Sequence, residues 1–267
     1  MTTQAWLAAP SPLPFEAEEV HVWVASLDVD DDELGFRAAV LDDHERARAR
    51  RMTREIAWRR FIAGRGLLRL LLGCYLDTPP AQVPLTQTPK GKPAVAEPGA
   101  DVRFNLSHSE GILVCGVTRG REIGADVERI RADISVEELA KRFFAPAEAA
   151  DLLARPISER RLAFFRAWTR KEAYIKGRGD GLAWPLDGFE VSTGPDAALV
   201  VDRNAPEAPN HWWLTEVIPE SEYLGAVAVE GPVCPLRLWR WPASRTLPRL
   251  LCQHDSDSRT APVRSRP

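Results

Sequence analysis

The stretch Phe165-Arg-Ala-Trp-Thr-Arg-Lys-Glu-Ala-Tyr-Ile-Lys176 determines how the rest of the chain is interpreted. It contains no Pro or Gly and is rich in helix formers, so it predicts a helix that Gly177 and Gly179 end. Glu172 and Lys176 fall at i, i+4 and share one helix face. On this segment alone, the pair is either a surface ion pair, worth ~0.3–0.5 kcal/mol, or part of a row of side chains on one helix face that take part in a reaction.

The composition is that of a globular protein. The 267 residues are 45% hydrophobic and 27% charged, which suits one large domain or two of ordinary size. A net charge of -3 gives no general argument for binding nucleic acid or membrane. The cysteines form no C-x-x-C pair, which speaks against a zinc site. No basic region precedes an apolar stretch at the N-terminus, and no run approaches the ~20 apolar residues of a membrane span, so we expect a cytoplasmic protein.

The order of elements predicts an α+β fold with a weak internal repeat. Helices over 42–76 precede strands near 102–106 and 112–117, and helices over 135–176 precede a hairpin between 212 and 230. Residues 243–267 show no periodicity, which is typical of a disordered tail. We therefore divide the chain into an N-terminal half (1–120), a C-terminal half (121–242) and the tail (243–267).

Two further segments alternate as strands do. Residues 19–28 alternate apolar and polar side chains, which predicts a strand buried on one face. In 123–128, Asp126 and Glu128 share one face with Gly124, while the other face is apolar. Two such carboxylates at 4 Å repel by ~4 kcal/mol at an effective dielectric of 20. Either they are solvated at a sheet edge or a cation lies between them.

An oxygen-only pair of ligands suits a hard divalent cation. Mg²⁺ takes one or two carboxylates together with phosphate oxygens and water. We therefore expect Mg²⁺, with Mn²⁺ as the alternative, if a cation is bound at Asp126 and Glu128.

Several other residues are suited to binding phosphate. Ser107 and His108 follow a strand, and because neighbours in a strand face opposite ways, His108 is badly placed to activate Ser107 as a nucleophile. Hydrogen bonding to a phosphate and a local turn both remain open for this pair. Lys92, between Gly91 and Pro93, and Arg60 are isolated cations, which are usually solvated but also serve as phosphate clamps.

Taken together, these motifs resemble one family, the Sfp-type 4′-phosphopantetheinyl transferases, over about residues 20–240. The resemblance rests on the ordered set Gly-Lys-Pro (91–93), Phe-Asn-Leu-Ser-His-Ser (104–109), Ile-Gly-Ala-Asp-Val-Glu (123–128), Lys-Arg-Phe-Phe (141–144) and Trp-Thr-Arg-Lys-Glu-Ala-Tyr-Ile-Lys (168–176).

The resemblance implies an enzyme that moves the phosphopantetheine arm of coenzyme A to a serine of an apo acyl, peptidyl or aryl carrier protein and releases adenosine 3′,5′-bisphosphate. It implies two similar halves related by a pseudo-two-fold, with coenzyme A between them, and a monomer. Glu45 departs from the family, which often has lysine there.

The resemblance also assigns residues. It implies that Asp126, Glu128 and Glu172 bind the metal and that Lys176 reaches the coenzyme A phosphates. From the chemistry of the reaction, Glu172 is also the candidate base for the serine proton. The remaining residues that match the coenzyme A site are Arg48, Arg60, Gly91, Lys92, Pro93, Ser107 and His108. The loop at 177–189 corresponds to a region that contacts the carrier protein.

Two other functions remain open at this point. A magnesium-dependent phosphodiesterase or nuclease would also use an acidic pair with Glu and Lys, although the chain has no basic stripe with interleaved aromatics. The non-enzymatic hypothesis is a module that has lost catalysis and only binds coenzyme A or a carrier protein.

Overall fold

The computed structural model describes residues 4–10, 13–96, 101–179, 181 and 184–242. The predicted tail at 243–267 and three residues of the 177–189 loop lie outside the described residues. The helices are α1 (Asp31–Ala39), α2 (Asp43–Arg50), α3 (Glu55–Leu76), α4 (Val136–Phe143), α5 (Pro146–Ala154), α6 (Ile157–Arg178) and α7 (Ala208–His211). The strands are β1 (Leu7–Ala8), β2 (Val20–Ser26), β3 (Leu85–Gln87), β4 (Pro93–Val95), β5 (Val102–Ser109), β6 (Ile112–Arg119), β7 (Ile123–Arg129), β8 (Phe189–Val191), β9 (Leu199–Asp202), β10 (Trp212–Val217), β11 (Tyr223–Glu230) and β12 (Leu236–Arg240).

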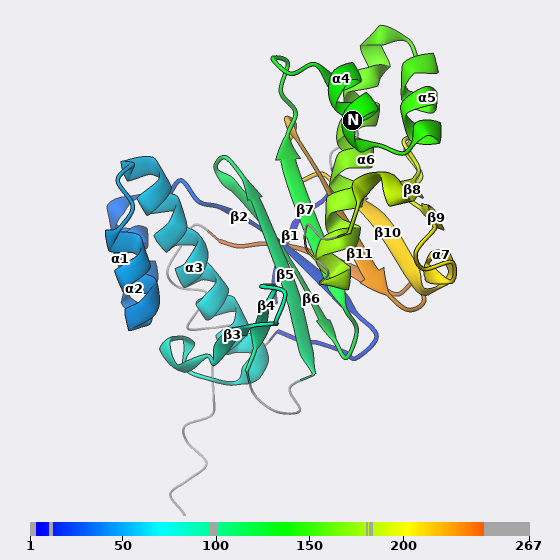
Figure 1. Ribbon diagram of the computed structural model, residues 1–267. Helices are drawn as coiled ribbons and strands as arrows, with labels where there is room; N and C mark the ends of the chain where they lie inside the picture. The colour runs from blue at the N-terminus through cyan, green and yellow to red at the C-terminus, as the bar shows by residue number, and fades with distance from the viewer. Residues whose placement is uncertain (1–3, 11–12, 97–100, 180, 182–183, 243–267) are drawn as a thin grey trace, which may run out of the picture.

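The two larger sheets contain the same arrangement of three strands (Figure 1). In the first, β2 pairs with β6 and β6 with β5, and in the second, β7 pairs with β11 and β11 with β10, always antiparallel. Each unit is thus a strand, then helices, then a hairpin whose second strand returns beside the first. This repeated unit agrees with the pseudo-two-fold α+β fold expected from the sequence. Strand β12 follows the second unit but extends the first sheet, parallel to β2.

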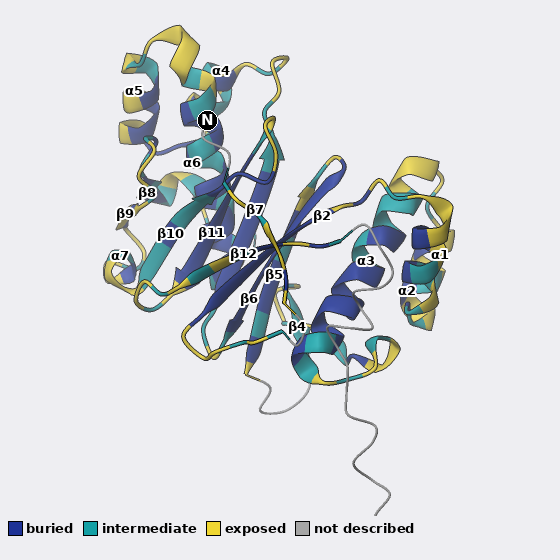
Figure 2. Cartoon of the chain, turned by 180° about the vertical axis from the view of Figure 1, so that it is seen from behind, coloured by how far each residue is buried: buried dark blue, intermediate teal, exposed yellow. Residues whose placement is uncertain are grey.

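Apolar side chains form three layers, and the strands between the helices are buried (Figure 2). Helix α3 packs on the first sheet through side chains such as Leu67 and Leu71. Helix α6 packs on the second sheet through Phe165 and Tyr174. Between the two sheets lies a third, largely valine layer, from β2, β6, β7, β10 and β11. Among the described helices, none has the length and apolarity needed to cross a membrane.

Strand β2 is buried on both faces, so the prediction of a strand buried on one face was wrong. Val20, Val22 and Val24 belong to the layer between the sheets, whereas the alternate residues Trp23 and Ala25 belong to the core beneath α3. The polar residue that suggested an open face, His21, is itself 0% exposed. Burial on both faces follows from the second sheet, which the local pattern does not encode.

A hydrogen-bonded chain satisfies the buried His21. Trp23 Nε1 donates to the hydroxyl of Tyr75 at 2.8 Å, and that hydroxyl lies 2.7 Å from His21 Nδ1. The other ring nitrogen lies 3.3 Å from a carboxylate oxygen of Glu19. Because a carboxylate accepts, this arrangement fits a neutral imidazole with its proton on Nε2. Burial lowers the pKa of His21 although Glu19 opposes the shift.

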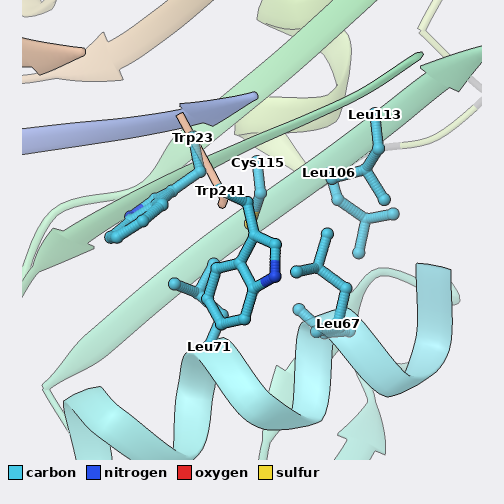
Figure 3. A pocket seen from close by; sticks show the side chains of 8 residues that line it. Trp23, Leu67, Leu71, Leu106, Leu113, Cys115 and Trp241 are labelled. Carbon is cyan, nitrogen blue, oxygen red and sulfur yellow. The ribbon is translucent and has the colours of Figure 1, made fainter. Parts of the chain in front are cut away.

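A small cavity of about 10 Å³ lies in the core beneath α3 (Figure 3). Its walls are apolar, with Leu67 and Leu71 from α3 facing Trp23 and Leu113 from the sheet. A space of this size holds about one water and offers it no set of polar partners. The cavity is therefore a packing defect and not a binding site.

Helix α6 approaches β7 so closely that only glycine fits at position 124. A Cβ built on Gly124 would lie 1.9 Å from the carbonyl oxygen of Ala173 and 2.2 Å from the amide nitrogen of Gly177. Both contacts are backbone atoms of α6, which cannot move aside as a flexible side chain can. The backbone of the helix therefore fills the place that a side chain at position 124 would take beside the two carboxylates.

We expect Gly124→Ala to separate α6 from β7 and to lower the free energy of unfolding by about 1–3 kcal/mol or more, as overpacking does. Urea unfolding measures this change. Gly35→Ala is the matched control, because Gly35 is exposed in α1 and its added Cβ meets no atom within 4 Å. The control should be neutral or stabilise by about 0.4–1 kcal/mol. Equal stability of the two variants would contradict the close approach.

We also expect His21 to make the protein less stable as the pH decreases. Its pKa is lowered in the folded protein, so the unfolded chain takes up the proton first as the pH decreases. The free energy of unfolding therefore decreases below about pH 6.5, the ordinary pKa of histidine. Urea unfolding at pH 7 and pH 5.5 should show a smaller loss in His21→Gln than in the parent protein, because the other titrating groups are shared. An equal loss of stability in both proteins would mean that groups other than His21 cause it.

Candidate active site

Polar side chains join β5, at the edge of the first sheet, to β7, at the edge of the second. We call this line of contacts between β5 and β7 the seam. The side chains of Asn105, Ser107 and Ser109 alternate along β5 and face β7. Asn105 Oδ1 accepts from the amide of Ala125 at 2.9 Å. Ser107 Oγ donates to Asp126 Oδ1 at 2.9 Å, and Ser109 Oγ donates to Glu128 Oε2 at 2.8 Å. Two of these residues, Asn105 and Ser109, were not predicted as site residues, although their i, i+2, i+4 spacing with Ser107 was visible in the sequence.

Asp126 and Lys176 form an ion pair at the centre of this seam. Lys176 Nζ lies 2.6 Å from Asp126 Oδ1 and 3.0 Å from Ser107 Oγ. Asp126 is only 2% exposed, which rules out the solvated edge for this carboxylate. Its second oxygen, Oδ2, is buried and has no hydrogen-bond partner among the described residues. Burial raises the pKa of Asp126, and Lys176 opposes that shift.

Glu128 and Glu172 lie close enough to Asp126 for their charges to interact. Burial, and then the charge of Asp126, raise the pKa of both Glu128 and Glu172. Glu172 projects from α6 one turn before Lys176, as the i, i+4 spacing predicted. Within the described ranges, no three His, Cys, Asp or Glu side chains are gathered as a metal cluster would require.

Two adjoining pockets continue from this seam over α2 and α3. Arg48, Arg60 and His108 line one of about 430 Å³. Arg48 and Phe61 also line the second, of about 500 Å³, together with Pro93. Partial burial, followed by the charges of Lys176 and Arg60, lowers the pKa of His108. His108 therefore connects the pocket to Lys176 and the acidic residues.

Lys92 does not contact Asp126, Glu128 or Glu172 but makes other contacts, and Gly91 lies beside it in a turn. Lys92 Nζ donates to Glu122 Oε2 at 2.7 Å and to the carbonyl of Gly177 at 2.8 Å. The lysine thus ties the C-terminal end of α6 to the N-terminal half. Gly91, with a φ of 87°, forms the turn before β4, and an added Cβ would meet no atom there.

Glu45, the departure from the family pattern, has a structural role. Its carboxylate is buried and is paired with Arg65 and Arg69 of α3. It also accepts from the amide of Asp42, which completes the capping box of α2. Because two guanidinium groups neutralise it, Glu45 does not leave an unpaired negative charge beside the pocket.

Comparisons with known proteins agree with this geometry. A family profile described as the 4′-phosphopantetheinyl transferase superfamily matches residues 122–228, and one described as 4′-phosphopantetheinyl transferase, N-terminal, matches residues 28–118. The 4′-phosphopantetheinyl transferase HetI of Nostoc sp. is 39% identical over 243 residues, which cover 90% of this chain and 100% of the relative. The 4′-phosphopantetheinyl transferase Sfp of Bacillus subtilis (strain 168) is 30% identical over 195 residues, covering 73% of this chain and 84% of the relative.

The two profiles fall on the two sheet-and-helix units. The resemblance inferred from the motifs is thereby confirmed, and neither a nuclease nor an inactive binding module is favoured. This chain belongs to the 4′-phosphopantetheinyl transferase family.

Proposed function

We propose that this enzyme transfers phosphopantetheine from coenzyme A to a serine of an apo acyl, peptidyl or aryl carrier protein, with Mg²⁺ or Mn²⁺ bound by Asp126, Glu128 and Glu172. The observation that carries the proposal is a row of charged groups. Arginines and His108 line one pocket, and Lys176, whose charge acts on His108, contacts the buried carboxylate of Asp126. A row that begins with cations and ends with carboxylates suits a phosphate ester held beside a metal ion.

The residues present fit a divalent cation. Asp126 Oδ2 is a buried acceptor with no partner among the described residues, and such an atom is costly unless a cation or donor satisfies it. Glu128 and Glu172 add oxygens nearby, and burial, followed by the charge of Asp126, raises the pKa of both, so a cation would relieve part of the cost of ionising them. When bound, the ion neutralises the pyrophosphate and aligns it for attack.

The pockets suit the nucleotide part of coenzyme A. Arg48 and Arg60 provide guanidinium groups for phosphate, and Phe61 and Pro93 provide apolar surface for a base. Arg60 is already fixed by a bidentate ion pair with Asp28, at 2.7 and 2.8 Å. It is therefore held in one orientation before the ligand binds.

The chain's own residues then act on one proton and one leaving group. Attack of the carrier serine on the β-phosphorus forms a P–O bond and breaks the bond to adenosine 3′,5′-bisphosphate. Glu172 takes the serine proton, and its raised pKa makes it a stronger base than an exposed glutamate. We assign to Lys176 the positive charge, and to His108 the hydrogen-bond donation, that stabilise the leaving phosphate. No covalent enzyme intermediate is needed.

The test is to incubate the enzyme with coenzyme A, Mg²⁺ and an apo carrier protein, and to weigh the carrier by mass spectrometry. We expect the mass to increase by one phosphopantetheine group, and adenosine 3′,5′-bisphosphate to appear in equal amount. Hydrolysed coenzyme A beside an unchanged carrier would instead indicate a phosphodiesterase. Intact coenzyme A and unchanged carriers, across acyl, peptidyl and aryl types, would refute the transferase. The same panel identifies the preferred carrier.

We expect Glu172→Gln to lower kcat by about 10²–10⁴-fold, the usual contribution of a positioned base, with little change in the KM for coenzyme A. Steady-state kinetics of the mass assay measure both constants. Glu159→Gln is the matched control, because Glu159 is exposed near the start of the same helix. It should behave as the parent enzyme. Full activity in Glu172→Gln would remove Glu172 from the proposed chemistry.

A further inference from the structure

Lys176 neutralises the carboxylate of Asp126, the group that a bound cation would also need. Its ammonium group makes the shortest contact of the carboxylate, 2.6 Å to Oδ1, and Ser107 Oγ lies within 3.0 Å of the same nitrogen. The side chain of Asp126 is 3% exposed, whereas that of Lys176 is 31% exposed. The free protein therefore neutralises its most buried site carboxylate with a lysine that still reaches solvent.

Two further observations concern the acidic side chains around Lys176. Among the residues that the structure describes, no three acidic, His or Cys side chains are gathered around one point. The oxygen of Asp126 that Lys176 leaves untouched, Oδ2, is buried and has no partner in the same part of the chain. An ion approaching Oδ2 meets the positive charge of Lys176 on the other oxygen of the same carboxylate. In this arrangement, the lysine and the ion compete for Asp126.

The pyrophosphate of coenzyme A would end this competition, because Lys176 could bind it in place of Asp126. A phosphate group is a stronger partner for an ammonium group than one carboxylate already shared with Ser107, because it carries more charge and more acceptor oxygens. Lys176 has a flexible four-carbon stem, and its charge is felt by His108, which lines the neighbouring pocket. Lys176 can thus reach a phosphate without any movement of α6.

We propose that Lys176 is the counter-ion of Asp126 in the free enzyme and transfers to the coenzyme A phosphate on binding, so that coenzyme A and the divalent ion enter together. This inference rests on the proposed function. The free enzyme then binds the ion weakly, and each ligand raises the affinity for the other by the same factor. Lys176 is in this respect a positioning residue that controls when the metal site forms.

Isothermal titration calorimetry with Mg²⁺ alone, in the absence of coenzyme A and carrier protein, tests the competition directly. We expect Lys176→Met to bind Mg²⁺ at least about tenfold more tightly than the parent enzyme, because a competing unit charge at short range is removed. Lys176→Arg, which keeps the charge, should bind the ion as weakly as the parent. Lys141→Met, which removes an exposed lysine from α4, should also match the parent. Circular dichroism establishes that each variant is folded.

Equal Mg²⁺ affinity in Lys176→Met and the parent enzyme would overturn the proposal, whether or not the carrier assay succeeds. A second measurement does not depend on any variant. In a crystal structure with coenzyme A and Mg²⁺, Lys176 Nζ should lie beyond hydrogen-bond distance of Asp126 Oδ1 and contact a phosphate oxygen. An intact Lys176–Asp126 pair in that complex would equally overturn the exchange. Failure of the carrier assay with tighter Mg²⁺ binding in Lys176→Met would refute the transferase function and leave the competition standing.

Discussion

The contact of α6 with β7 at Gly124 is the constraint on which the site depends. Because position 124 has no side chain, the backbone of α6 lies against the strand, and Lys176 reaches Asp126 from one turn beyond Glu172. Any side chain there would push the helix outward and separate the lysine from the carboxylate. The carboxylates come from the strand and the lysine from the helix, so the distance between these two elements sets the geometry of the chemistry.

The same helix uses its other charged residues for structure. Lys171 is 0% exposed, and its ammonium group contacts Glu148 at 2.7 Å and the carbonyls of Leu186 and Phe189. Arg170 donates to carbonyl oxygens of Ser192, Gly194 and Pro195, and burial lowers its pKa to about 10. The helix therefore carries one set of charges that fixes the following loops and another set, Glu172 and Lys176, that faces the seam. Neighbouring charged residues in one motif have different functions because they point to different sides of the helix.

Pairing of buried charges is a general feature of this fold. Glu45 is held between Arg65 and Arg69, Glu148 beside Lys171, and Asp126 beside Lys176. Breaking such a pair leaves one charge uncompensated in a poorly hydrated place, which costs several kcal/mol. The carboxylate of Asp126 differs from those of Glu45 and Glu148 in that one of its oxygens is unsatisfied within the described residues, and its lysine is partly exposed. A pair with these two properties is suited to exchange its partner for a ligand.

The sequence by itself determined several of the elements and one face of the site. The helices expected over 42–76 are α2 and α3, the hairpin expected between 212 and 230 is β10–β11, and the alternation over 123–128 placed Asp126 and Glu128 on one side of β7. Helix α1 and strand β12 were not predicted. These features depend on periodicities of two or 3.6 residues, which are local. The ordered motifs also identified the family, because five short patterns in one order are specific when combined.

Only the tertiary structure decided which of these residues meet. Lys176 pairs with Asp126, 50 positions away, and Lys92 contacts the carbonyl of Gly177, 85 positions away, instead of pointing to the carboxylates. Strand β2 is covered on both faces because a second sheet packs against the first. Such contacts depend on how close the sheets and helices pack, and that distance is set jointly by side chains from both halves. A local pattern states which face a residue is on, but it does not state what covers that face.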